Sequence, residues 1–145
     1  HDVAELGIER TERLVHQEAF RPPHDGAPER HALAVATGKT RAGLDRAIAK
    51  NGLAGRFHAT RCADEGAPKP DPWMLRDICD ELGLQASDTL MIGDTTHDLQ
   101  LAANAGVPCV GVSYGAHPSE DFHRFSPLFV AHSTRELHDW LQQHA

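Results

Sequence analysis

Apolar residues along the chain fall into short runs and helical stripes that alternate from residue 32 onward. The runs at 32–37 (ALAVAT) and 88–94 (DTLMIGD) are almost wholly apolar between polar ends, which is typical of strands covered on both faces. The stretches 41–51 and 72–82 place apolar residues three and four positions apart, as amphipathic helices do. The same patterns predict further strands at 56–62, 108–115 and 128–130, and helices at 96–105 and from Ser133 or Thr134 onward.

Strands and helices that alternate with short connections predict an α/β fold. We expect a doubly wound, Rossmann-like parallel sheet with helices on both faces. Residues at the helix ends agree with this interpretation: Pro72 stands in the first turn of its helix and Gly83 lies just past its end, and Gly106 closes the helix at 96–105.

The first thirty residues do not continue the alternation of strand and helix patterns seen in the rest of the chain. Residues 3–20 have apolar positions at roughly helical spacing and predict an amphipathic helix, although Gly7 weakens it. Residues 21–30 (RPPHDGAPER) gather prolines and a glycine, which indicates a linker. We therefore divide the chain into a helix and linker at 1–30 and a core at 31–145.

Composition limits the classes of function. A chain of 145 residues has the size of one domain and can bury its own core. The cysteines, Cys62, Cys79 and Cys109, are odd in number and widely spaced, so we interpret them as reduced and buried. A net charge of −7 argues against a nucleic-acid surface. The histidines have no metal-ligand spacing, and the absence of a long apolar run predicts a cytoplasmic protein without a membrane segment.

The first candidate site residues follow the strand at 32–37. The hydroxyl of Thr37 and the backbone N–H of Gly38, held at a strand end, can donate together to a phosphoryl oxygen. Gly38-Lys39-Thr40 is not the tail of a Walker A loop, because the required first glycine position is occupied by Leu33. The alternative is that Thr37 only caps the following helix.

The second candidate is Lys69, which stands between Pro68 and Pro70. The prolines stiffen the segment, and a compact cation on a stiff segment suits a contact to a phosphate or a carboxylate. The alternative is a solvated loop lysine.

The third candidate site follows the strand at 88–94. Asp94 comes directly after this strand and Asp98 falls in the first turn of the next helix, so both carboxylates can face one space. Paired carboxylates suit Mg²⁺, which keeps several waters and is completed by a substrate phosphate. Gly93 permits a tight exit from the strand. The alternative is that Asp98 caps the helix and Asp94 is a turn residue.

The order Thr-Gly, Lys-Pro and Gly-Asp-x-x-x-Asp resembles motifs two, three and four of the haloacid dehalogenase superfamily. The stretches LAVATGKTRAGLDRAI, KPDPWML and MIGDTTHDLQLAANAGVPCVGVSYG are similar to its phosphoglycolate-phosphatase-like branch, over residues 33–117. The resemblance implies a Mg²⁺-dependent phosphatase that forms an aspartyl-phosphate with a small phosphorylated metabolite. It assigns the phosphoryl contacts to Thr37 and Gly38, charge neutralisation to Lys69, and the metal to Asp94, with Asp98 as a ligand or an orienter of its waters.

The family's first motif, D-x-D-G-[TS], which supplies the nucleophile, does not occur in the chain, and His24-Asp25-Gly26 is no substitute for it. In the family, the strand that carries this motif lies between the two strands that end here at Thr37 and Asp94. Without it, those strands would face a gap or pair directly. We therefore interpret residues 1–30 as a remnant of a helical cap, expect a missing N-terminal segment, and expect the chain to be inactive as given.

Other functions stay open at this point. The chain can be a truncated or degenerate relative that binds an anion or Mg²⁺ without catalysis. A sugar phosphomutase shares the same motifs. A response-regulator receiver domain is disfavoured, because there the acidic residues come first and the Lys-Pro last. The sequence indicates no oligomeric state.

Overall fold

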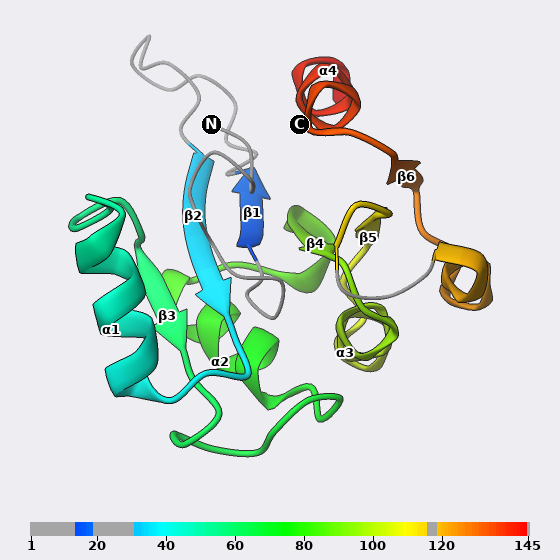
Figure 1. The fold of residues 1–145 in the computed structure, drawn as a ribbon. Helices are drawn as coiled ribbons and strands as arrows, with labels where there is room; N and C mark the ends of the chain where they lie inside the picture. Colours follow the sequence, from blue (N-terminus) through cyan, green and yellow to red (C-terminus); the bar gives the residue numbers. More distant parts are fainter. Residues whose placement is uncertain (1–13, 19–30, 116–118, 145) are drawn as a thin grey trace, which may run out of the picture.

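The computed structural model describes residues 14–18, 31–115 and 119–144. A six-stranded sheet runs through this part of the chain in the order β3-β2-β1-β4-β5-β6 (Figure 1). The strands are β1 Leu14–Glu18, β2 His31–Ala36, β3 Ala59–Arg61, β4 Thr89–Gly93, β5 Cys109–Val112 and β6 Phe129–Ala131. The helices are α1 Arg41–Lys50, α2 Trp73–Leu82, α3 Thr96–Ala105 and α4 Thr134–His144, with short 3-10 helices η1 Ala86–Asp88 and η2 Ser119–Phe125.

The predicted elements of the core are confirmed. Each predicted strand and helix between residues 32 and 144 is present, although β3 is shorter than the predicted 56–62, and the short helices η1 and η2 were not predicted. The helix ends follow the expected chemistry: Gly83 and Gly106 have φ values of 70° and 71°, in the left-handed region that suits glycine. The α/β class with helices on both faces of the sheet is therefore correct.

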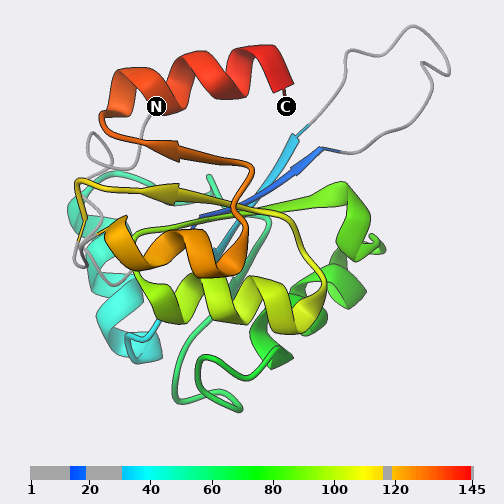
Figure 2. The same ribbon diagram turned by 90° about the vertical axis from the view of Figure 1, so that its right-hand side faces the viewer.

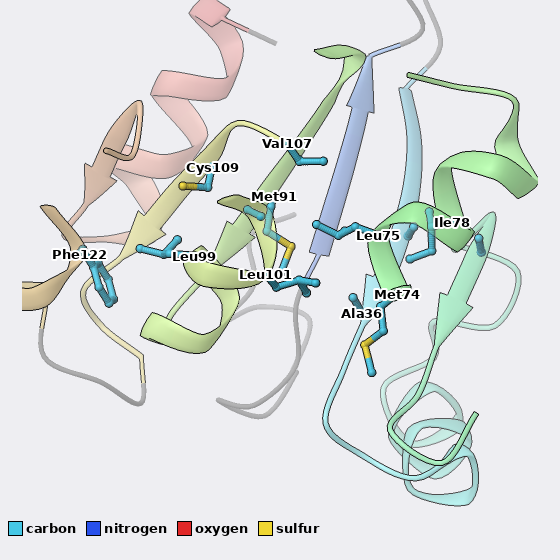
Figure 3. Close-up of a cluster of buried hydrophobic side chains, with 13 residues drawn as sticks. Ala36, Met74, Leu75, Ile78, Met91, Leu99, Leu101, Val107, Cys109 and Phe122 are labelled. Carbon is cyan, nitrogen blue, oxygen red and sulfur yellow. The ribbon is translucent and has the colours of Figure 1, made fainter. Parts of the chain in front are cut away.

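Two layers of helices cover the sheet (Figure 2). Alternate residues of each strand point to opposite faces. On one face Ala34, Ala36 and Met91 pack with α2, α3 and η2, as Figure 3 shows for Met91 beside Leu99 and Leu101. On the other face β2 packs against α1, and β4, β5 and β6 pack against α4. Burial on both faces explains why the strand sequences are continuously apolar.

The predicted helix over residues 3–20 is wrong in the part that the structure describes. Residues 14–18 form β1, and residues 3–13, 19 and 20 lie outside the described residues. β1 lies between β2 and β4 and runs antiparallel to both, whereas the other strands are parallel to one another. The two inner strand edges take hydrogen-bond partners from β1, and this demand overrides a weak helical pattern.

The expected gap between the strands that end before Thr37 and Asp94 is therefore closed, but not by the strand that the family uses. β1 belongs to the sheet although residues 1–30 were assigned to a separate helix and linker. The linker at 21–30 lies wholly outside the described residues, and β2 begins directly after it at His31. The division of the chain at residue 30 stays a prediction.

No helix in the described ranges combines the length and the apolar character that crossing a bilayer requires. The three cysteines are buried and form no disulfide, as the sequence predicts. Cys62 follows β3 and Cys109 begins β5. Burial raises the pKa of each of these two thiols to about 11.

These two thiols make the stability of the fold sensitive to alkaline pH. Below the ordinary thiol pKa of 9.0 they are protonated in both the folded and the unfolded chain. Above it the unfolded chain loses their protons first, so we expect the free energy of unfolding to fall as the pH rises from about 9 to about 11. Urea titrations at several pH values measure this. The fall should be smaller in the variant with Cys62→Ala and Cys109→Ala, and an equal fall in that variant would contradict the assignment.

Candidate functional site

The carboxyl ends of β2 and β4 form one edge of the sheet. β1 fixes their relative height, because Leu14 pairs with both Val35 of β2 and Ile92 of β4. Thr37 lies two positions after Val35, and Asp94 lies two positions after Ile92. The two residues are therefore at the same height along the strands. With one strand between them, the two strands are about 10 Å apart. The strands therefore bring Thr37 and Asp94 to the same edge of the sheet.

Thr37 is fully buried at the end of β2. Its backbone N–H donates to the Arg61 carbonyl at 3.1 Å, and its hydroxyl oxygen accepts from the Lys39 backbone N–H at 3.1 Å. The alternative role as a helix cap is wrong, because Thr40 caps α1 and accepts from the Gly43 N–H at 3.1 Å. The Thr37 oxygen is engaged as an acceptor, so its proton is the part of the hydroxyl that can serve a ligand.

Lys69 connects the candidate residues after β2 with those after β4. Its Nζ donates to the Ala36 carbonyl and to Asp98 Oδ1, both at 2.9 Å. The first contact lies beside Thr37, and the second lies one helical turn beyond Asp94. The Lys69 side chain is only 10 % exposed, so the alternative of a solvated loop lysine is wrong. The Lys69 ammonium group thus contacts Ala36, 33 positions before it in the sequence, and Asp98, 29 positions after it.

The loop that carries Lys69 is held at several points. The Lys69–Pro70 peptide bond is cis. Asn104, near the end of α3, donates through Nδ2 to the Pro70 carbonyl at 2.9 Å. At the start of α2 the Trp73 N–H donates to Asp71 at 2.9 Å, and the Trp73 ring leaves no room for a Cβ at Gly66, which would meet it at 2.7 Å.

A second network fixes the start of the same loop. The Arg41 guanidinium donates to Glu65 Oε1 and to Thr60 Oγ1, each at 2.8 Å. Glu65 also accepts from the Cys62 N–H at 2.8 Å. The hydrogen bond to Glu65 raises the pKa of Arg41, opposed by partial burial. Sequence reasoning missed Arg41, Glu65 and Asn104, because no local pattern shows which loop a surface polar residue contacts.

Asp98 is fully buried and has several partners. Oδ1 accepts from Lys69, and Oδ2 accepts from the Thr95 N–H at 3.0 Å and the Thr95 hydroxyl at 2.7 Å. In return, the Thr95 oxygen accepts from the Asp98 N–H, which completes a capping box at the start of α3. The helix-terminal role considered for Asp98 is therefore present, with Thr95 as the N-cap. The role of Asp98 at a metal stays a prediction, and the geometry favours one that acts through Lys69.

Asp94 is 5 % exposed and follows β4 directly. Two glycines make room around the carboxylate pair. A Cβ added at Gly93 or at Gly115 would come within 3.0 Å of side-chain atoms of Asp98 or Asp94, respectively. Carboxylate oxygens are ligands that suit a small hard cation such as Mg²⁺, and these two carboxylates lie close to the same glycine-lined space. Among the described residues there is no group of three or more His, Cys, Asp or Glu side chains that could hold a metal ion.

The middle strand brings no carboxylate to this edge. Because β1 is antiparallel to its neighbours, its first residue, Leu14, lies at the site end, and Glu18 pairs with His31 at the opposite end. The D-x-D motif is absent from the whole sequence. Thr37, Lys69, Asp94 and Asp98 are thus assembled, and the position between the strands carries no attacking group from β1.

Comparisons with known proteins agree with this arrangement. A model of the haloacid dehalogenase-like hydrolase family matches residues 27–112. A probable phosphatase, IndB of Dickeya dadantii strain 3937, is 36 % identical over 108 residues, which are 74 % of this chain and 47 % of the relative. A phosphoglycolate phosphatase of Rhodospirillum rubrum is 42 % identical over 73 residues, 50 % of this chain and 30 % of the relative.

The same fold is present in a solved structure. A HAD-superfamily hydrolase of subfamily IA from Geobacter sulfurreducens superposes with a TM-score of 0.60 at 24 % identity, over 74 % of this chain and 51 % of that one. The matches thus span between 30 % and 51 % of the length of these proteins. The family match covers β2 to β5 and includes Thr37, Lys69, Asp94 and Asp98. The chain belongs to the haloacid dehalogenase-like hydrolase family.

Proposed function

We propose that this chain supplies the phosphate-binding and metal-binding part of a Mg²⁺-dependent phosphatase that acts on a small phosphorylated metabolite. The observation that carries the proposal is the position of Lys69, whose Nζ contacts both the carbonyl next to Thr37 and the Asp98 carboxylate at 2.9 Å. The Lys69 ammonium thereby links the end of β2, which suits a phosphoryl group, to the carboxylates after β4, which suit a metal. The names of the relatives, which are phosphatases, support the reaction class.

Each residue has a role in this scheme. The Thr37 hydroxyl and the Gly38 N–H donate to phosphoryl oxygens, and Lys69 offsets the negative charge that gathers there. Asp94 holds Mg²⁺, and Asp98 keeps Lys69 in place. Mg²⁺ held there would supply positive charge that offsets the negative charge of the phosphoryl oxygens. Positioning and charge compensation supply most of the catalysis in phosphoryl transfer. The buried side chains of Thr37, Lys69 and Asp94 can contribute to both.

The attacking aspartate is the part that the 145 residues do not provide. We propose that the chain as given is inactive, and that activity needs a segment with D-x-D between β2 and β4. Such a segment would have to replace β1, whose site end is Leu14. A phosphomutase would use the same residues with a different acceptor. We also keep the cytoplasm as the proposed location, with no nucleic-acid partner, given the net charge of −7.

A non-catalytic binding module is the second candidate. The antiparallel β1 favours it, because a chain that closes its sheet with Leu14 at the site end can be folded and still lack the nucleophile. Such a module would retain Thr37, Lys69 and Asp94 for binding an anion or a cation.

Loss of Asp94 separates the two candidates. We expect the gene product that contains this chain to hydrolyse p-nitrophenyl phosphate with Mg²⁺, and Asp94→Asn to lower kcat/KM by about 100-fold or more, since one ligand charge is lost. The matched control is Asp80→Asn, on the exposed side of α2, which should leave activity unchanged. Steady-state kinetics measure both. An inactive gene product that still binds Mg²⁺ would favour the binding module, and full activity in Asp94→Asn would overturn the assigned role.

The Lys69–Asp98 pair is also a structural element, and its two roles can be separated by stability. Lys69→Met would leave the Asp98 carboxylate, 1 % exposed, without its ammonium partner. We expect a loss of about 3–5 kcal/mol in the free energy of unfolding. Arg135→Met is the control, because its pair with Asp139 is 3.7 Å long and exposed, and it should cost about 0.5 kcal/mol or less.

A double variant shows whether the loss comes from the buried charge. Lys69→Met with Asp98→Asn removes that charge, so it should be more stable than Lys69→Met alone while remaining without phosphatase activity. Urea denaturation gives the free energies. Equal stability losses in Lys69→Met and Arg135→Met would mean that the pair is not buried in solution.

A further inference from the structure

The turn after β5, residues 113–115, lies directly against Asp94. A Cβ built on Gly115 would approach Cβ, Cγ and Oδ2 of Asp94 to less than 3.0 Å, a separation that real Cβ atoms essentially never show. Asp94 Cβ is attached to the backbone and cannot swing away as the end of a long side chain can. The position that a side chain at 115 would take is therefore already occupied by Cβ, Cγ and Oδ2 of Asp94.

The conformation of the backbone does not explain this glycine. The described glycines with positive φ are Gly52, Gly55, Gly83 and Gly106, and Gly115 is not among them. An alanine could therefore adopt the same φ and ψ without the strain that a left-handed residue suffers. What requires a glycine at this position is the closeness of Asp94.

The turn is also anchored on its other side. The Ser113 N–H donates to the Ala131 carbonyl at 2.9 Å, and Ser113 Oγ is 2.7 Å from His132 Nδ1. Ala131 ends β6 and His132 follows it, so the turn is tied to the next strand of the sheet. A side chain at position 115 would have to move Asp94, or break these contacts, by on the order of 1.5 Å to reach an ordinary carbon–carbon separation.

We propose that Gly115 is a positioning residue for Asp94: the absence of a side chain there fixes where the Asp94 carboxylate lies and thereby sets the affinity of the site for Mg²⁺. The metal half of this inference rests on the proposed function. Residues that orient a metal ligand commonly change metal affinity by about 10–100-fold when they are altered. Gly115 itself contacts neither metal nor substrate in this scheme.

Calorimetric titration of the gene product with MgCl₂ tests the metal half. Gly115→Ala should weaken Mg²⁺ binding by about 10-fold or more relative to the wild type. Gly111→Ala is the matched control: it lies in β5, four residues before Gly115, and its Cβ would press on the Phe122 ring at 2.6 Å instead of on Asp94. We expect this control to lower the melting temperature and to keep the wild-type Mg²⁺ affinity. An affinity of Gly115→Ala within twofold of the wild type would overturn the proposal.

A double-mutant cycle tests the positional half without any metal. Asp94→Gly removes the atoms that a Cβ at 115 would meet, so the fall in melting temperature caused by Gly115→Ala should shrink to less than half in the Asp94→Gly background. An equal fall in both backgrounds would overturn the proposal. If Gly115→Ala alone does not fold, recovery of folding in the double variant is the expected result, and failure to recover counts against it.

The two arms also separate this inference from the proposed function. A wild-type protein that does not bind Mg²⁺ would refute the proposed metal site, while coupling between positions 94 and 115 would still support Gly115 as the residue that places Asp94.

Discussion

The inner edges of β2 and β4 face each other across the width of one strand, and their backbone groups must be hydrogen-bonded for the sheet to form. Buried N–H and carbonyl groups must find partners, and β1 supplies them to both strands at once. This bridging brings the ends of β2 and β4 to one level and so places Thr37 and Asp94 across from each other. The reach of Lys69 from the Ala36 carbonyl to Asp98 depends on the same spacing. A parallel or an antiparallel strand can satisfy the hydrogen bonds of β2 and β4. The direction of the strand nevertheless matters for catalysis, because it determines which of its residues lies at the site. Here the strand that satisfies the backbone brings Leu14 there.

Local signals account for how well the core could be predicted from the sequence. The strands β2 and β4 are short apolar runs, and α2 and α3 end at glycines in the left-handed conformation, so each boundary has a cause within a few residues. The segment at 14–18 has no such signal. Its apolar residues suit a weak helix, and only the demand of two distant strand edges makes it a strand. A prediction that sees one segment at a time cannot include that demand.

The site divides in the same way. The sequence was sufficient to predict that Thr37, Lys69, Asp94 and Asp98 lie at one edge of the sheet, because parallel strands bring their carboxyl ends together there, and the roles of these residues stay predictions. Their partners could not be predicted. Thr40 caps α1 and leaves Thr37 at the edge, and Asp98 serves Thr95 and Lys69 at the same time. The contact from Gly115 to Asp94 was equally hidden, since a glycine after a strand usually indicates a turn and nothing more.

A buried ion pair such as Lys69–Asp98 is weak support for function, since it can stabilise a fold whether or not any reaction occurs there. The surroundings of Asp94 discriminate better. Burial of its carboxylate to 5 % exposure removes hydration that its contacts must offset, and a glycine at 115 whose φ needs no glycine opposes stability through backbone entropy. A fold selected for stability alone would lose nothing by filling that space with a methyl group and replacing the aspartate. Two locally unfavourable features in contact with each other are expected where a site must hold a charged ligand in one place, so Asp94, more than the ion pair, is the expected centre of the proposed site.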